Sequence, residues 1–109
     1  MNKTIFEQSE FWITAKGEVC KIEEMETLHL LNILRMFELK PTIIQSLLIK
    51  EVNEIWGLNK EASLNNITSL SNDQLKEYFY KCKLYKAMRE ELEKRGVNVA
   101  QMLKNFRGE

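Results

Sequence analysis

The sequence predicts a mostly helical α+β fold, in which an N-terminal β-hairpin at about residues 11–22 packs on three or four helices. Two observations support this prediction. A glycine turn joins two short segments rich in β-forming residues. Most of the remaining chain repeats its apolar residues at the spacing of a helix. With 109 residues, 44% of them hydrophobic, the chain has the length and composition of one globular domain, residues 1–109.

The hairpin prediction rests on Lys16-Gly17, which separates residues 11–15 from residues 18–22. A two-residue loop with glycine second indicates a type I′ turn, because both central residues of that turn need a positive φ. This register predicts the pairs Ala15–Glu18, Ile13–Cys20 and Phe11–Ile22. One face, toward the helices, would then carry Phe11, Ile13, Cys20 and Ile22, and the other Trp12, Thr14, Val19 and Lys21.

Apolar periodicity predicts helices over about 26–39, 41–56, 72–95 and 99–106. Pro41 separates the first two, because the residue before proline disfavours the helical conformation and proline itself suits a first helical turn. Gly57 and Gly96 are placed to end the second and third helices. Ser71 and Gln74 form a capping-box pattern at the start of the third helix, and Asn98 can cap the fourth.

Residues 58–70 are rich in asparagine and serine, so we expect an internal loop there. Its three apolar residues can turn toward the core: Leu64, Ile67 and Leu70.

Charge and hydropathy argue against several classes of function. Sixteen basic and sixteen acidic side chains cancel, so the whole molecule creates no strong field toward DNA or a membrane. No apolar run approaches the ~20 residues that cross a bilayer, and the N-terminus lacks the apolar core of a signal peptide. We therefore expect a cytoplasmic protein without a membrane partner.

The histidine and cysteines do not form a recognisable catalytic or metal-binding pattern. His29 is the only histidine, and Cys20 and Cys82 lack the close spacing of metal ligands. The four glycines are scattered, which disfavours a phosphate-binding loop. We therefore expect no metal, no cofactor and no enzymatic activity. A cysteine–histidine nucleophilic pair stays a weaker alternative, and the expected role of His29 is a hydrogen bond to the hairpin backbone or to Asn32 one turn on.

Binding to nucleic acid is the second alternative. The predicted helix 72–95 carries Lys81, Lys83, Lys86 and Arg89 among four aromatic residues, and basic residues between aromatics can bind single strands by charge and stacking. Most of these aromatics fall on the side predicted to be buried, so a solvated basic face is the favoured interpretation.

The hairpin and the first helix resemble a segment of small phage- and prophage-encoded proteins of unassigned function. The matching positions are Trp12, Thr14, Gly17, Ile22, Met25, His29, Leu30, Asn32, Ile33 and Met36. Similar proteins also end with a pattern matched by Tyr85, Glu91, Leu92, Arg95 and Gly96. The chain departs from them at Glu26, where such proteins often have Thr or Asp, and residues 38–72 have no counterpart.

This resemblance implies a mobile-element origin and marks a fold rather than an activity. Phage accessory proteins of this size often act by covering a surface of a host protein. We therefore expect a non-enzymatic module that binds a host or phage protein, with inhibition of a host defence or regulatory protein as one such role. Trp12, His29 and Asn32 are the expected binding residues, beside the hairpin edges. Packing of Trp12 against the domain is the alternative for that residue, and a homodimer is compatible with the apolar helices.

Overall fold

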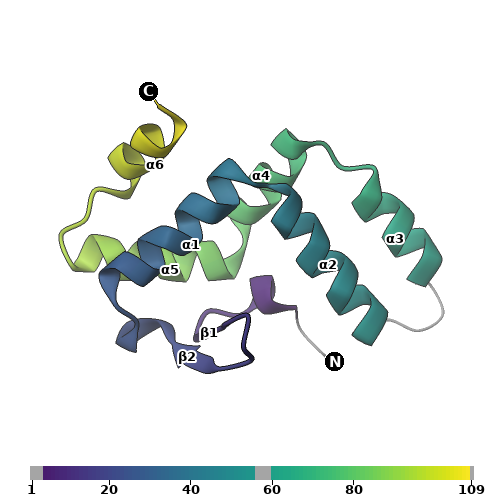
Figure 1. Cartoon of the computed structure of the whole chain (residues 1–109), viewed down its shortest axis with the longest axis horizontal. Coiled ribbons are helices and arrows are strands. Elements are labelled where there is room, and N and C mark those ends of the chain that lie inside the picture. Colours follow the sequence, from purple (N-terminus) through teal and green to yellow (C-terminus); the bar gives the residue numbers. More distant parts are fainter. Residues whose placement is uncertain (1–3, 56–59, 109) are drawn as a thin grey trace.

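The computed structural model describes the backbone of residues 4–55 and 60–108 and the side chains of residues 4–52 and 64–108. It confirms the mostly helical α+β fold with an N-terminal two-stranded antiparallel hairpin (Figure 1). The short elements come first: η1 (Ile5–Glu7), β1 (Phe11–Ile13), β2 (Val19–Lys21) and η2 (Ile22–Glu24). The helices follow: α1 (Thr27–Leu39), α2 (Thr42–Ile55), α3 (Lys60–Thr68), α4 (Asn72–Lys81), α5 (Lys83–Lys94) and α6 (Val99–Arg107).

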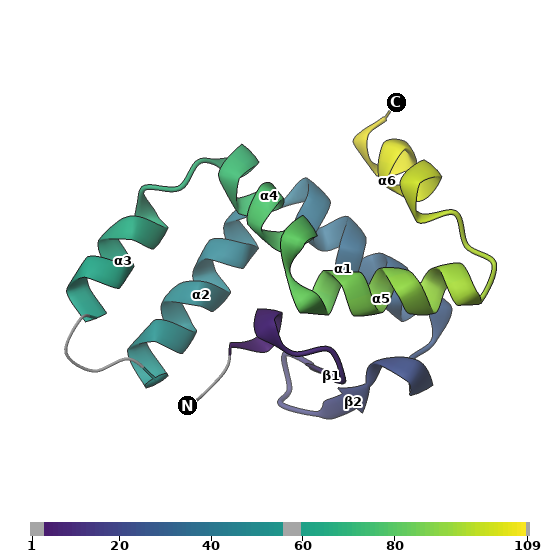
Figure 2. The same ribbon diagram turned by 180° about the vertical axis from the view of Figure 1, so that it is seen from behind.

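The molecule has a central body and an extension at one end. Helices α1 and α5 pack together in the body, with the hairpin below them and α6 at the far end in Figure 1. Helices α2 and α3 form an antiparallel pair at the opposite end, as the view from behind also shows (Figure 2). The helix stop predicted at Gly57 lies outside the described residues.

The hairpin forms where predicted, but its register differs by one residue. The observed pairs are Phe11–Lys21, Trp12–Cys20 and Ile13–Val19. The amide of Thr14 donates to the carbonyl of Glu18 at 2.9 Å, and Gly17 N donates to Thr14 O at 2.9 Å. Among the described residues only glycines have a positive φ, so Lys16 cannot occupy a type I′ turn. The loop is instead a three-residue turn that ends in left-handed Gly17 (φ 85°).

The new register reverses the predicted face of β1 alone. Cys20 of β2 faces inward as predicted, and its partner on β1 is Trp12 instead of Ile13. Trp12 lies opposite Cys20 and faces the core, with only 8% of its surface exposed. Ile13 and Val19 face outward and are 43% and 68% exposed. Tryptophan removes more apolar area from water than isoleucine, which favours the register that buries Trp12.

Helices α1 and α2 follow the predicted pattern closely. The apolar stripe of α1 is buried along its length: Leu30, Ile33, Leu34 and Phe37. The chain leaves the helical conformation at Lys40, and Pro41 directly precedes α2. The carbonyl of Pro41 accepts a hydrogen bond from Ile44 N at 2.9 Å, so proline initiates the second helix as expected.

The prediction of a loop over residues 58–70 is wrong, because α3 occupies most of that range. Asparagine and serine have modest helical propensity, and tertiary contacts with α2 compensate for it. Ile67 is half-buried against the core, and the side-chain amide of Gln45 on α2 donates to Ile67 O at 3.0 Å. Helix α3 therefore depends on its neighbour more than on its own sequence.

The single helix predicted over 72–95 is also wrong: it is interrupted at Cys82, which has the extended conformation φ −78°, ψ 159°. The interruption has a packing reason. Leu75 and Phe79 of α4 point to one side of a helical cylinder, whereas the buried residues Leu84, Tyr85, Met88 and Leu92 of α5 lie on a different side. One straight helix cannot bury both stripes, so the chain turns at Cys82, whose Sγ accepts a hydrogen bond from Tyr85 N.

The predicted helix caps are confirmed. Gln74 N donates to Ser71 Oγ at 3.2 Å, and Ser71 N donates to the Gln74 side chain at 2.8 Å, which completes the capping box. Asn98 caps α6 by accepting a hydrogen bond from Gln101 N at 3.0 Å. These local signals operate within one turn of helix, so they need no knowledge of the fold.

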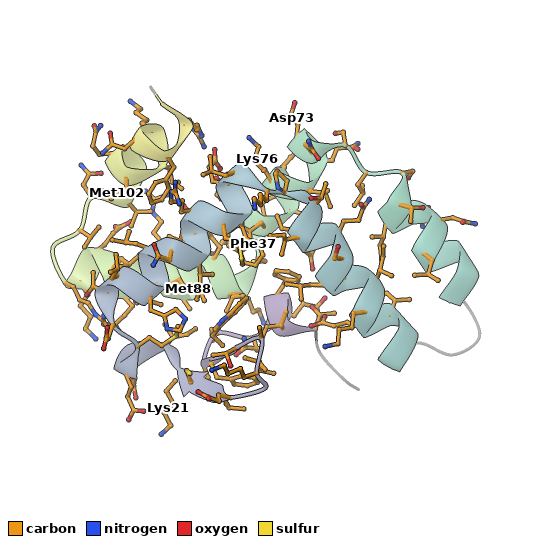
Figure 3. All side chains as sticks on the ribbon, viewed as in Figure 1. Lys21, Phe37, Asp73, Lys76, Met88 and Met102 are labelled. Carbon is orange, nitrogen blue, oxygen red and sulfur yellow. The ribbon has the colours of Figure 1, made fainter. Side chains whose placement is uncertain are left out.

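An aromatic cluster holds the hairpin and helices together. Phe37 of α1 lies 4.5 Å from Phe79 of α4, 6.0 Å from Phe6 of η1 and 5.9 Å from Trp12 of β1, measured between ring centroids. All three contacts are edge-on or tilted, which suits aromatic rings. Figure 3 shows Phe37 and Met88 near the middle of the molecule. The cluster fixes the hairpin against α1.

Two charged side chains, half-buried Arg95 and buried Glu38, tie distant segments together. Arg95, at the end of α5, donates to Met25 O at 2.7 Å, Thr27 Oγ1 at 3.1 Å and Glu23 O at 3.1 Å, and it pairs with Glu91 at 2.8 Å. It thereby holds the start of α1. Glu38 of α1 is buried between Lys76 of α4 (Figure 3) and Arg107 of α6.

Candidate functional site

The three predicted binding residues, Trp12, His29 and Asn32, line one groove. The groove has a volume of about 530 Å³ and lies between the turn end of the hairpin, α1 and α2. This volume is within the usual range of about 300–1,000 Å³ for ligand pockets. Residues from separate elements thus meet on one surface, and the groove is the candidate functional site.

Trp12 forms a wall of the groove rather than a protruding anchor. The pairing with Cys20 turns its ring inward, where it packs edge-on against Phe37. Of the two roles considered for Trp12, the structure shows the one in which it packs against the domain. Trp12 can still contribute the part of its surface that lines the groove.

His29 and Asn32 stand on the rim, one turn apart on α1, and both are exposed. The hydrogen bond predicted from His29 to the hairpin or to Asn32 is not among the hydrogen bonds of the described residues. Side chains three apart on a helix share a face, so both polar groups are available beside the groove. They can donate and accept hydrogen bonds to a bound molecule.

The walls of the groove are apolar. Ile33 and Met36 come from α1, and Ile43 and Leu47 come from α2. Met36, Ile43 and Leu47 are half-buried, so part of each side chain faces the groove. Ile5 completes the wall and is held in place because its amide donates to Glu51 Oε1 of α2 at 2.8 Å. An exposed apolar hollow with a polar rim is typical of an interaction site.

The remaining polar groups carry charges of both signs. Thr14 of the hairpin and Lys50 and Glu51 of α2 also line the groove. Lys50 is exposed and forms no ion pair with another described residue, so its ammonium group can pair with an incoming carboxylate.

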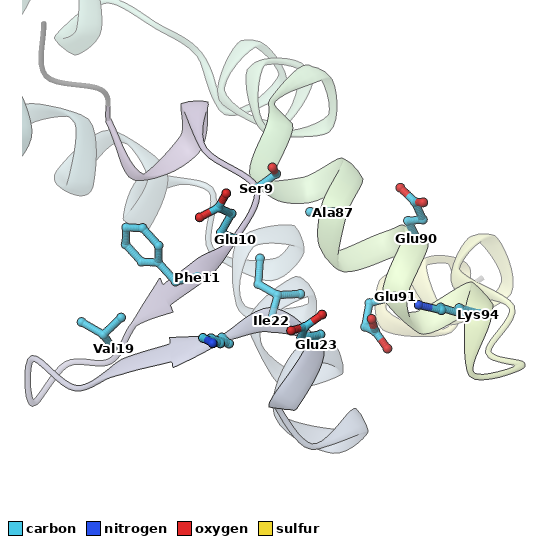
Figure 4. A pocket seen from close by; sticks show the side chains of 11 residues that line it. Ser9, Glu10, Phe11, Val19, Ile22, Glu23, Ala87, Glu90, Glu91 and Lys94 are labelled. Carbon is cyan, nitrogen blue, oxygen red and sulfur yellow. The ribbon is translucent and has the colours of Figure 1, made fainter.

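A second cleft of about 550 Å³ lies on the other side of the hairpin, against α5 (Figure 4). Phe11 and Ile22 contribute apolar surface, and the rim carries glutamates and lysines, with Glu90 and Lys94 on α5. One of the glutamates, Glu91, already pairs with Arg95. This cleft is more polar than the groove between hairpin, α1 and α2.

The predicted nucleic-acid face is divided and partly neutralised. Lys81 is on α4 and pairs with Glu77 at 2.7 Å, which also lowers the pKa of Glu77. Arg89 is on α5 with Lys83 and Lys86, and it pairs with Glu93 at 2.5 Å; this hydrogen bond and the one to Tyr85 raise the pKa of Arg89. The aromatic residues among these cations pack against one another: Tyr78, Phe79, Tyr80 and Tyr85 are half-buried or buried. In the described part of the chain, these rings are therefore not exposed together as a stacking platform for bases.

The cysteines do not line the groove that His29 borders, within the described part of the chain. Cys82 is buried at the junction of α4 and α5, and burial raises the pKa of its thiol. A thiol held protonated is a weak nucleophile. Among the described residues, no three histidine, cysteine, aspartate or glutamate side chains are grouped so that they could hold a metal ion.

Sequence reasoning missed the contribution of α2 and η1 to the groove. Neither Ile43 nor Leu47 of α2, nor Ile5 of η1, was predicted to take part in binding. A signal existed for α2, since its apolar residues cover more of the helix surface than one core-facing stripe needs. No local signal places η1 beside α2, because the bond between Ile5 and Glu51 joins segments 46 residues apart.

Comparisons with protein-family models, with curated proteins and with solved structures found no match for this chain. None of the helices within the described residues combines the length and apolar character that crossing a bilayer requires.

Proposed function

We propose that this chain is a non-enzymatic protein-binding module that uses the groove between the hairpin, α1 and α2. The proposal rests on one observation above all: Trp12, His29 and Asn32 line a single apolar groove with a polar rim that includes Lys50. The occupant we propose is a segment of a partner protein that inserts apolar side chains into the groove and places a carboxylate beside Lys50.

The chemistry of the groove supports such a segment. Burying one large aliphatic or aromatic side chain contributes about 1.5–3 kcal/mol, and Ile33, Met36, Ile43 and Leu47 supply the apolar surface for it. His29 and Asn32 can satisfy the polar groups of the segment at the rim. Lys50 adds selectivity, since an acidic residue in the partner is attracted and a basic one is repelled.

The resemblance to phage and prophage proteins supports a host protein as the partner. Occupation of a functional surface on that protein would inhibit it, and a defence or regulatory protein is the class we propose. The module itself needs no cofactor for this role, since binding alone produces the effect.

A selection from a displayed library of short random peptides tests the groove. The expected peptides contain an apolar residue followed or preceded by Asp or Glu. Leu47→Asp should lower the affinity of the selected peptide by at least about tenfold, which corresponds to about 1.4 kcal/mol. Leu28→Asp is the matched control, because Leu28 is 67% exposed on α1 and does not line the groove.

Two outcomes would contradict the proposal. One is equal loss of affinity in Leu47→Asp and Leu28→Asp, which would indicate a general effect of charge. The other is a set of peptides whose binding is unchanged by Leu47→Asp, His29→Ala and Lys50→Gln together, because such peptides bind elsewhere. Thermal unfolding of each variant checks that the fold is retained.

A further inference from the structure

The two edges of the hairpin differ in whether their backbone groups are already used. In an antiparallel pair, residues alternate between those that bond across the ladder and those whose amide and carbonyl point away from it. Ile22 N bonds to Glu10 O at 3.0 Å and Thr14 N bonds to Glu18 O at 2.9 Å. The outward groups therefore belong to Phe11 and Ile13 on β1 and to Val19 and Lys21 on β2.

The β1 edge is closed by the side chain of Gln8. Its Oε1 accepts hydrogen bonds from Phe11 N at 2.9 Å and from Glu10 N at 2.9 Å, and its Nε2 donates to Phe11 O at 2.7 Å. A single amide thus makes the two hydrogen bonds to Phe11 that a neighbouring strand would make. Edge strands are commonly protected against added strands, and here the protection is a glutamine.

The β2 edge has no such cover within the described part of the chain. The amides of Val19 and Lys21 and the carbonyl of Val19 have no partner among the hydrogen bonds of the described residues. The side chain of Val19 is 68% exposed, so apolar surface lies beside the free backbone groups. Figure 1 shows β2 as the strand farther from α1 and α5, and Val19 and Lys21 line the cleft of about 550 Å³.

We propose that β2 accepts an extended, basic segment of a partner protein as a third strand. The inference rests on the proposed protein-binding function and names a second partner segment for it. Free strand-edge groups select an extended backbone, because only a strand presents donors and acceptors at the matching spacing.

Charge selects the side chains of that segment. Residues 18–26 carry four glutamates and one lysine, and all five are exposed: Glu18, Glu23, Glu24, Glu26 and Lys21. None of the four carboxylates forms an ion pair with another described residue. Glu18 lies at one end of β2 and Glu23 at the other, so lysine or arginine at both ends of the added strand is favoured. A residue with a β-branched side chain suits the position opposite Val19.

The test uses a capped peptide of alternating valine and threonine with lysines at both ends. Amide hydrogen exchange followed by NMR is the measurement. In the free protein the Val19 and Lys21 amides should exchange rapidly, while those of Trp12 and Cys20 are protected by the ladder. The peptide should protect Val19 and Lys21. A version with N-methylated backbone amides should fail to bind, and a version with terminal glutamates should bind more weakly.

Lys21→Pro tests the edge on the protein side. Lys21 has φ −71°, close to the value of about −65° that proline imposes, and its amide points away from β1, so the hairpin should persist. The variant should weaken peptide binding by about tenfold. Lys21→Gln is the matched control, since it removes the same charge and keeps the amide, and it should bind the basic peptide at least as tightly as the original chain.

Other results would overturn the inference. Peptide binding without protection of Val19 and Lys21, or no binding at all, excludes a third strand on β2. Protection that rises with protein concentration in the absence of peptide would assign this edge to a second copy of the chain. Leu47→Asp separates the two proposals: a strand on β2 is insensitive to that change, whereas a segment in the groove between the hairpin, α1 and α2 is insensitive to Lys21→Pro.

Discussion

The central body and the α2–α3 extension are stabilised in different ways. In the body, α1, α4 and α5 bury aromatic residues around Phe37, and Arg95 and Glu38 join segments that are distant in sequence. In the extension, none of the described side chains of α3 is fully buried, and the helix packs mainly on α2. The difference suggests that the groove has one rigid side, α1 and the hairpin, and one side, α2, whose outer face depends on a less stable neighbour.

The largest expected effect comes from removing the centre of the body. Phe37→Ala should lower the free energy of unfolding by about 3–5 kcal/mol, because it leaves a cavity among Phe6, Trp12 and Phe79. Urea denaturation followed by circular dichroism measures the change. A loss smaller than that of a single exposed substitution would show that the aromatic cluster is not the centre of stability.

Removal of the Arg95 side chain should be the next largest effect. Arg95→Ala eliminates the hydrogen bonds to residues 23–27 and leaves the half-buried Glu91 without its partner. Hydrogen bonds that involve a charged group contribute about 1.5–3 kcal/mol, so a loss of about that size is expected. Arg95→Lys should recover only part, since lysine lacks the planar fork. Full recovery would mean that charge alone matters.

The capping box tests how much local signals contribute. Ser71→Ala should cost about 1 kcal/mol, because Gln74 N loses its side-chain acceptor at the start of α4. Ser71→Asp, which can still cap the helix, serves as control. An effect of equal size in both variants would assign the loss to something other than the cap.

Ile67→Ala should distinguish the extension from the body. Ile67 is only half-buried against the core, so the loss should be about 1 kcal/mol or less. Hydrogen exchange should rise in α3 first, with little change in α1 and α5. Uniform acceleration across all helices would show that α3 unfolds together with the body, and the contrast between the two regions would then be wrong.

The smallest effect near neutral pH is expected at Tyr78, where α4 meets η1. Burial raises the pKa of the Tyr78 phenol to about 12. The folded state therefore favours the protonated phenol: stability is unaffected below the ordinary pKa of about 10 and falls as pH rises from about 10 to about 12. Tyr78→Phe should reduce this alkaline loss. Titration of tyrosinate absorbance that shows every tyrosine ionising near pH 10 would contradict it.

Sequence patterns predicted the elements whose signals are local. The caps at Ser71 and Asn98, the start of α2 at Pro41 and the stripe of α1 all act within a few residues. The predictions were wrong where packing between distant segments determines the backbone conformation. On one continuous helix, Leu84 and Tyr85 would lie on a different side from Phe79. This change of side was a sequence signal for the interruption at Cys82. The helix over 60–68 had no comparable signal.

The groove was partly predictable. His29 was identified as the only histidine, with Asn32 one turn on, and Trp12 as a candidate anchor in the hairpin. The position of Trp12 beside α2 depends on the register of the hairpin, and the predicted register differs from the observed one by one residue. Because the side-chain period is two, this error reversed the predicted face of β1, whereas β2 keeps Cys20 inward as predicted.

By itself, the sequence determined the fold class, the position of the hairpin, the starts of α2, α4 and α6 and the residues from which a binding surface could be built. These follow from backbone preferences and short-range hydrogen bonds, which neighbouring residues set. Only the tertiary structure decided that Trp12 faces inward, that residues 60–68 are helical and that one strand edge is covered by Gln8 while the other is open. Those choices depend on which apolar areas can be buried together, and segments far apart in the chain set that balance.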